Sequence, residues 1–173
     1  MTDAYFKPRT AEEIVGATPG ADYYVYVDLC KDRRHAADIL LSLPEKSFIL
    51  ISSPTDKHKG HWVAISRDTT NRKIFYFDSY GYGPDRAKMK WLTPQQLRQS
   101  GQMRNLFNDG LKELCRRGWE VHYNDVKYQV EGDLSATCGI WASAFLNSEV
   151  NPDVFAAHPP DLRNYYRVYF RKE

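Results

Sequence analysis

The segment of residues 61–78 constrains the fold more than any other part of the sequence. Residues 61–66 and 73–79 alternate in the way that is typical of β-strands. The polar residues 68–71, Asp-Thr-Thr-Asn, separate them and predict the loop of a hairpin. With these four residues as the loop, the facing pairs are Arg67 with Arg72, Ile65 with Ile74, Val63 with Tyr76, and His61 with Asp78.

This register predicts that His61 lies directly opposite Asp78. Opposed residues of an antiparallel pair have Cβ atoms about 4.5–5.5 Å apart, so an imidazole and a carboxylate can hydrogen-bond there. In a catalytic triad, such a carboxylate orients the imidazole base and stabilises its protonated form. A slip of one residue would place the two side chains on opposite faces. The alternative is a His–Asp pair at the edge of an ordinary hairpin.

Cys138 stands where a helix is predicted to begin, at the start of the apolar stretch 137–147. Ser135 or Thr137 is a suitable N-cap, and the partial positive charge of a helix N-terminus favours a thiolate. The amides of the first turn could hold an oxyanion, with Gly139 allowing close approach. The alternative is a buried structural cysteine.

The other two cysteines are not expected to take part in chemistry. Cys115 follows Leu111 and Leu114 at helical spacing and is predicted to pack in the core, and packing is also favoured for Cys30. An odd count of three argues against a disulfide framework, and no close Cys–Cys or His–His pair predicts a metal site. No signal peptide or membrane-spanning run is expected, so we expect a reducing compartment.

The order of the remaining elements predicts an α+β chain with a central, mostly antiparallel sheet flanked by helices. Its 173 residues, 42% of them hydrophobic, suit a single domain over residues 1–173. The expected elements are a loop with one helical turn over 1–22, a strand over 23–29, a helix over 32–43, a strand over 47–52, one or two helices between Thr93 and Gly118, and a strand over 119–124.

Taken together, four motifs resemble the adenovirus-type (adenain-like) maturation proteases and their relatives, the proteases of SUMO and other ubiquitin-like proteins. The motifs are His61-Trp62, the run from Asp78 through Ser and Tyr to Gly81, an upstream glutamine, and Cys138-Gly139-Ile140-Trp141. The resemblance covers residues 48–147 and implies a papain-like fold. It also implies that Gln129 helps to form the oxyanion hole and that Trp62 and Gly139 contact substrate. The spacing from Gln129 to Cys138 is longer than in the family.

The resemblance implies a cysteine endopeptidase with a His61–Asp78–Cys138 triad. Its expected substrates are viral capsid or scaffold precursors cut at small, Gly-containing sites. The first alternative is a protease of ubiquitin or SUMO-like modifiers that acts on host proteins. The second is a non-catalytic, DNA-binding or capsid-associated protein. The expected location is the host cytoplasm or nucleus and the virion, without secretion.

No cofactor is expected to be required, but the resemblance leaves DNA open as a stimulating partner. Residues 86–128 carry nine basic and four acidic side chains, although the whole chain has a net charge of only +2. The alternative is an ordinary solvated helix face. The tail over 163–172 interleaves basic and aromatic residues and is predicted either to contact nucleic acid or to form a last strand.

Overall fold

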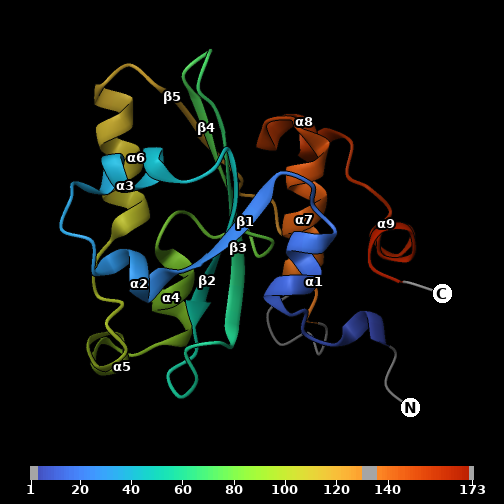
Figure 1. Cartoon of the computed structure of the whole chain (residues 1–173), viewed down its shortest axis with the longest axis horizontal. Helices are drawn as coiled ribbons and strands as arrows, with labels where there is room; N and C mark the ends of the chain where they lie inside the picture. The colour runs from blue at the N-terminus through green and yellow to red at the C-terminus, as the bar shows by residue number, and fades with distance from the viewer. Residues whose placement is uncertain (1–3, 130–135, 172–173) are drawn as a thin grey trace.

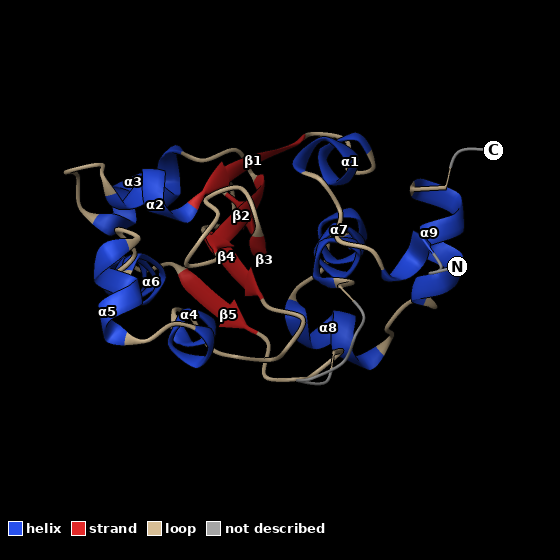
Figure 2. Cartoon of the chain, turned by 90° about the horizontal axis from the view of Figure 1, so that it is seen from below, coloured by secondary structure: helices blue, strands red, loops and turns tan. Residues whose placement is uncertain are grey.

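A five-stranded sheet stands between two groups of helices in the computed structural model, which describes residues 4–129 and 136–171 (Figure 1). Helices α2 to α6 cover one face, and α1 and α7 to α9 lie on the other side, as the turned view also shows (Figure 2). The described elements are η1 (Ala4–Phe6), α1 (Ala11–Gly16), β1 (Ala21–Val25), α2 (Tyr26–Cys30), α3 (Ala36–Ser42), β2 (Lys46–Ser52), β3 (Gly60–Asp68), β4 (Lys73–Phe77), α4 (Arg86–Trp91), α5 (Pro94–Gln99), α6 (Leu106–Arg116), β5 (Glu120–Tyr123), α7 (Cys138–Ser148), α8 (Pro152–Ala157) and α9 (Leu162–Tyr169).

The strands follow one another across the sheet in the order of the sequence. β2, β3 and β4 pair antiparallel, whereas β1 pairs parallel with β2 and β4 pairs parallel with β5. Parallel neighbours need long crossover connections, which α2 and α3 supply at one edge and α4 to α6 at the other. The predicted α+β class is therefore confirmed, and antiparallel pairing is confined to the three central strands.

Alternation along the central strands divides the apolar side chains between two cores. Ile49, Ile51 and Val63 face the layer with α3 and α6, where they pack with Leu40 and Phe107. The intervening positions face the opposite layer and pack with α7 and its neighbours; they are Phe48, Leu50, Trp62, Ala64 and Phe77. Both faces of the sheet are covered, so side chains at the end of the central strands can meet groups from either layer.

The predicted hairpin is confirmed, but its register is wrong by two residues. Ile65 pairs with Tyr76 and Asp68 pairs with Lys73, so the four-residue loop is 69–72. Asp68 remains in the strand because its carboxylate accepts hydrogen bonds from the backbone N–H and side chain of Asn71. Asp78 therefore does not lie directly opposite His61. A two-residue shift keeps both residues on the same face of the sheet.

The two ends of the chain differ from prediction because tertiary contacts override local pattern. The predicted strand over 23–29 stops at Val25, and α2 follows, in which the Tyr26 hydroxyl is hydrogen-bonded to the Asp85 carboxylate and to the Arg104 backbone carbonyl. The predicted last strand is instead α9. Its N-cap is Asp161, and its buried residues, Leu162 and Tyr166, have the i,i+4 spacing of a helix.

The prediction for Cys115 is wrong, because this side chain is exposed on α6. The buried face of α6 is centred near Phe107, Leu111 and Leu114. Each helical residue is rotated by about 100° from the one before, which takes Cys115 past the edge of that face. Cys30 is partly buried, in keeping with packing. In the described part of the chain, no helix has the length and apolar character needed to cross a membrane.

Candidate active site

His61 and Asp78 are in direct contact at the end of the sheet. The His61 Nε2 atom lies 2.9 Å from Asp78 Oδ1, and both side chains are buried. His61 is near the start of β3 and Asp78 follows the last residue of β4, so the two side chains meet diagonally across the hairpin. Because Nε2 faces the carboxylate, Nδ1 is the ring nitrogen left for a second partner. This geometry suits a base held in one tautomer by a carboxylate.

Asn124 fixes the backbone of Asp78 from the neighbouring strand. The backbone N–H of Asp78 donates to Asn124 Oδ1 at 2.8 Å, and Asn124 Nδ2 donates back to the Asp78 carbonyl at 2.6 Å. Asn124 is itself buried and directly follows β5. The backbone N–H of Tyr80 then donates to Asp78 Oδ1 at 2.8 Å, which holds the carboxylate toward His61. Asn124 was not foreseen from sequence, because no motif marks this asparagine.

Cys138 is the first residue of α7, as predicted, and it is buried. Thr137 occupies the N-cap position but makes no capping hydrogen bond with its side chain, and Ser135 lies outside the described residues. The helix is fixed against the sheet by apolar packing. The rings of Phe145 and Phe77 stack with centroids 4.7 Å apart. The position of the thiol is therefore set by long-range contacts.

The electrostatics of the site favour a thiolate beside an imidazolium. Burial raises the pKa of the Cys138 thiol, but the hydrogen bond and charge of His61, with a hydrogen bond from the Trp62 backbone, outweigh burial and lower it. Burial lowers the pKa of His61, but the charge and hydrogen bond of Asp78, with those of Cys138, raise it to about 10. A lowered thiol pKa next to a raised imidazole pKa is the property of an activated cysteine nucleophile.

Gln129 is buried beside the same site. Its Oε1 atom accepts a hydrogen bond from the Ser79 hydroxyl, and its backbone N–H donates to the Ser79 carbonyl at 3.0 Å. The hydrogen bond to Oε1 fixes the orientation of the Gln129 side-chain amide. The position of its Nε2 donor is therefore fixed as well. Gln129 lines one cavity together with His61 and Cys138. Ser79 was noted from sequence only as part of the motif that begins at Asp78, and no role was assigned to it.

The two residues expected to contact substrate lie in different surroundings. Trp62 lines a cavity of about 740 Å³ that also reaches Cys138, and its ring packs edge-on against Tyr23. Gly139 is not among the described residues that line the cavities at Cys138. A Cβ atom at Gly139 would lie 3.0 Å from Ile14 Cγ2 and 3.4 Å from Trp62 Cδ1. Glycine at this position lets α7 pack closely against Ile14 and Trp62, and contact of Gly139 with a substrate stays a prediction.

A second cavity of about 310 Å³ opens on the other side of Cys138. Its lining includes His61, Gln129 and the aromatic side chains of Tyr80 and Trp91. The rings of Trp91 and His61 have centroids 5.0 Å apart. Trp91 comes from the end of α4, a helix that was not foreseen, and no local sequence pattern identifies it as part of the site.

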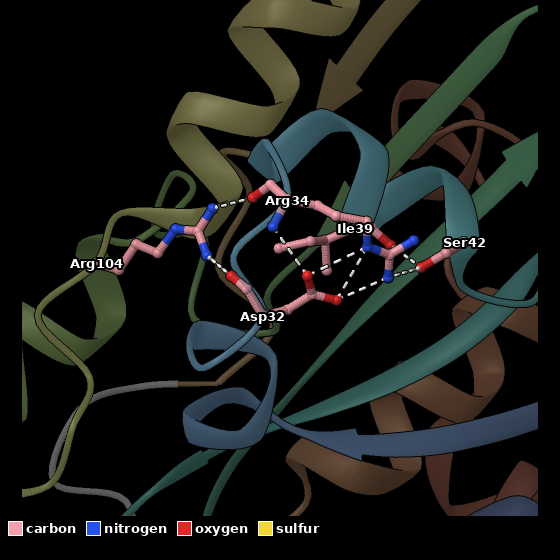
Figure 3. Close-up of polar contacts among 5 residues, drawn as sticks. All are labelled: Asp32, Arg34, Ile39, Ser42 and Arg104. Atoms are coloured by element: carbon pink, nitrogen blue, oxygen red, sulfur yellow. Dashed lines mark hydrogen bonds and ion pairs between the residues drawn. The ribbon is translucent and has the colours of Figure 1, made fainter.

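The basic segment 86–128 is less available to a polyanion than its composition suggests. Lys88 is buried, with 1% of its surface exposed. Arg104 donates to the backbone carbonyls of Asp32 and Arg34, which ties it to the loop before α3 (Figure 3). Arg117 forms ion pairs with Asp38 and Glu113. These three side chains have structural roles that the count of charges did not reveal.

Within the ranges 4–129 and 136–171, no three His, Cys, Asp or Glu side chains converge as a metal ion would require. The polar groups brought together at the end of the sheet are a thiol, an imidazole, a carboxylate and a side-chain amide, the residue types that acyl-transfer chemistry uses.

No protein-family model matches the sequence. Several solved structures are similar to the chain, among them the following two. One is the C-terminal protease domain of Ulp1 in complex with Smt3, the yeast orthologue of SUMO; it is 17% identical, with 92% of this chain and 70% of that chain covered and a TM-score of 0.41. The other is ChlaDub1 from Chlamydia trachomatis, at 15% identity, 95% and 85% coverage and a TM-score of 0.40.

Proposed function

We propose that the chain is a cysteine peptidase that cleaves protein substrates with Cys138 as nucleophile. The observation that supports this most directly is the buried His61–Asp78 pair, whose atoms lie 2.9 Å apart, beside Cys138, with His61 placed so that its hydrogen bond and charge lower the pKa of the Cys138 thiol. A structural cysteine gains nothing from such an arrangement, whereas a nucleophile requires it.

The reaction begins when the Cys138 thiolate attacks the carbonyl carbon of the scissile bond and a C–S bond forms. The carbonyl oxygen becomes an oxyanion, which the Gln129 side chain and the Cys138 backbone N–H stabilise. The C–N bond then breaks as protonated His61 gives its proton to the leaving amine. Water, deprotonated by His61, attacks the thioester, releases the acid and restores the thiolate. Asp78 orients His61 throughout.

Two substrate classes follow from the motif resemblance, which implies glycine or other small residues near the scissile bond. One is the C-terminal tail of a ubiquitin-like modifier, and the other is a capsid or scaffold precursor of viral maturation type. Ubiquitin and SUMO fluorogenic conjugates test the first class directly. Rapid turnover of either conjugate would support the modifier class and remove the reason to invoke maturation. Cleavage confined to Gly-containing precursor peptides would support the maturation class.

A vinyl-sulfone or iodoacetamide probe tests the enzyme proposal independently of substrate. We expect selective modification of Cys138, located by peptide mass spectrometry, that is lost in His61→Ala. Equal modification of Cys138 in the wild type and in His61→Ala would contradict an activated nucleophile. It would instead favour a non-catalytic, DNA-binding or capsid-associated role.

We further propose that no metal or organic cofactor is needed and that DNA stimulates the activity. Activity measured with EDTA, and with a titration of double-stranded DNA at two salt concentrations, tests both points. A stimulation that is lost at the higher salt concentration indicates binding to phosphates. The proposed location, in the host cytoplasm or nucleus and the virion, is testable by microscopy of a tagged chain.

A further inference from the structure

The two cavities at Cys138 divide the site into two sides. Both are lined by Gly60, Ala136 and Cys138, so they meet at the nucleophile. Of the two, the cavity of about 310 Å³ is the one that His61 and Gln129 also line. The cavity of about 740 Å³ is lined instead by residues of 7–12 and by Trp62.

The proton transfer decides which part of a substrate enters which cavity. The leaving amine must lie within reach of the His61 ring, since His61 protonates it. The part of the substrate on the amine side of the scissile bond therefore lies beside His61, in the cavity of about 310 Å³. The chain on the acyl side extends into the other cavity. This assignment rests on the proposed peptidase function.

The lining of the amine-side cavity is mainly aromatic and aliphatic. The Tyr80 and Trp91 rings lie 5.2 Å apart between centroids and both contact the His61 ring. Ile51, Pro54 and Leu92 complete the apolar surface. Trp91 is 40% exposed, which is high for a tryptophan packed against a catalytic-type histidine. An apolar side chain seated here would remove this exposed ring surface from water.

Positive charge lies next to Trp91, on two lysines that are not part of the cavity lining. Tyr82 packs against Trp91 with centroids 5.9 Å apart, and two ammonium groups lie over the Tyr82 ring. They are Lys90 Nζ at 5.4 Å and Lys127 Nζ at 5.7 Å from the ring centroid. A lysine or arginine side chain of a substrate would meet like charge at this point.

Trp91 is held in place because the buried Lys88 side chain anchors α4 to residues 102–104. The buried Lys88 ammonium donates to the carbonyls of Gln102 and Arg104 at 2.8 and 2.7 Å. Gln102 in turn is hydrogen-bonded through its side chain to the backbone of Ser52, the last residue of β2. The wall of the cavity is thus tied to the sheet that carries His61, as a preformed subsite requires.

We propose that this cavity is a specificity subsite for the residue directly following the scissile bond. It accepts a large apolar side chain and disfavours a basic one, with Trp91 as the principal contact. In an apolar pocket, one extra or missing methylene changes the selectivity by about 10- to 200-fold, so a Leu-to-Ala ratio of at least about 10 is expected.

A proteome-derived peptide library tests the proposal with no assumption about which residues bind on the acyl side. The library is cut with a glutamate-specific protease, so that lysine and arginine remain inside the peptides. Incubation with the wild type, and with Cys138→Ala as the blank, gives the residues on both sides of each cleavage. We expect enrichment of Leu, Met and Phe, and depletion of Lys and Arg, at the first position after the cut.

Matched peptides then measure the contribution of Trp91. Two peptides that differ only in Leu or Ala after the scissile bond give a ratio of kcat/KM. We expect Trp91→Ala to reduce this ratio toward 1 and Met89→Ala to keep it, since Met89 is exposed on the same helix and does not line the cavity. Leu92→Ala, a smaller change in the same wall, should reduce the ratio partly and remains informative if Trp91→Ala unfolds.

The possible failures are distinguishable. Cleavage with no preference after the cut, or a Leu-to-Ala ratio unchanged in both Trp91→Ala and Leu92→Ala, would overturn the subsite and leave the peptidase standing. Absence of both cleavage and selective labelling of Cys138 would overturn the peptidase proposal, and the subsite with it.

Discussion

The two halves of the candidate site are built by different means. The sheet half contains His61, Asp78 and Asn124, which belong to three adjacent strands or follow them directly. The helix half contains Cys138, whose position depends on the packing of α7 against the far face of the sheet. Hydrogen bonds between neighbouring strands therefore fix the sheet half. Burial of apolar side chains between α7 and the sheet fixes the helix half.

This difference decides how each half responds to damage. Hydrogen bonds at the sheet half orient two charged groups, so a loss there changes protonation and geometry while the core remains. At the helix half, the Cys138 sulfur supplies the reacting electrons in the proposed mechanism, and its loss would remove the covalent route altogether. The effects that we expect from perturbing the two halves range from the loss of peptide cleavage to a change in the pH dependence of Cys138 modification.

Cys138→Ala should reduce peptide cleavage by at least about 10⁴-fold, because the covalent pathway is lost. His61→Ala should have a comparable effect, because residues of such a unit do not act additively. Circular dichroism and a thermal melt should show a folded protein in both cases. Cys115→Ser, which changes an exposed thiol outside the site, is the matched control and should retain full activity. Cleavage that persists in Cys138→Ala would refute the mechanism.

Asp78→Asn should leave weak activity, with a loss of up to about 10⁴-fold in kcat. The neutral amide can still hydrogen-bond to His61, but it cannot stabilise the imidazolium, and it can hold the wrong tautomer. The rate of Cys138 alkylation at neutral pH should fall together with kcat. A fall in kcat at an unchanged alkylation rate would mean that Asp78 acts on the substrate and not through His61.

The sheet half could be predicted from sequence because side chains alternate between the two faces of a strand, so a register error of two residues leaves each side chain on its correct face. The register was wrong by two residues, yet His61 and Asp78 kept the same face and meet diagonally. An error of one residue would have separated them. Asn124 escaped prediction because its role depends on the parallel pairing of β4 with β5, which follows a crossover of three helices.

The helix half was predicted only in part. The apolar run after Cys138 indicated a buried helix, and its first residue was placed correctly. The contact between Cys138 and His61 required the resemblance to a family, because residue 61 lies in the sheet and residue 138 in a helix that packs on it from a distant part of the sequence. Trp91 had no sequence signal at all, since its position depends on α4 and on the buried Lys88 beneath it.

Gln129→Ala should reduce kcat by about 10²- to 10³-fold if its amide stabilises the oxyanion. KM should change little, because the interaction strengthens only in the transition state. Ser79→Ala is the informative companion, since it releases the anchor on Oε1 and leaves the amide in place. We expect a smaller loss for Ser79→Ala. Equal losses in kcat/KM and in ground-state binding would point to substrate contact instead.

Asn124→Ala should destabilise the fold by about 1–3 kcal/mol, because the backbone N–H and carbonyl of Asp78 would remain buried without partners. Activity should fall by about 10- to 100-fold through displacement of the carboxylate. Asn71→Ala, at the exposed turn of the same hairpin, is the control and should affect neither quantity strongly. A stability loss without a change in the pH profile of kcat would limit Asn124 to a purely structural role.

The smallest effect is expected from pH, and it tests whether the two halves are electrostatically coupled. The thiolate persists at any pH above the lowered pKa of Cys138, and the imidazolium persists at any pH below the raised pKa of His61, about 10. Between these limits, the rate of iodoacetamide modification of Cys138 should be nearly constant, whereas the thiolate fraction of an ordinary thiol with a pKa near 8.5 rises about tenfold per unit across neutral pH. In the Cys115→Ser background, Cys30 should react slowly over the whole pH range, because burial raises its pKa to about 11.

Cleavage should decline as the pH approaches 10, because His61 can then no longer protonate the amine. A modification rate for Cys138 that climbs steeply across neutral pH, as for an uncoupled thiol, would separate the two halves and remove the basis for an ion pair.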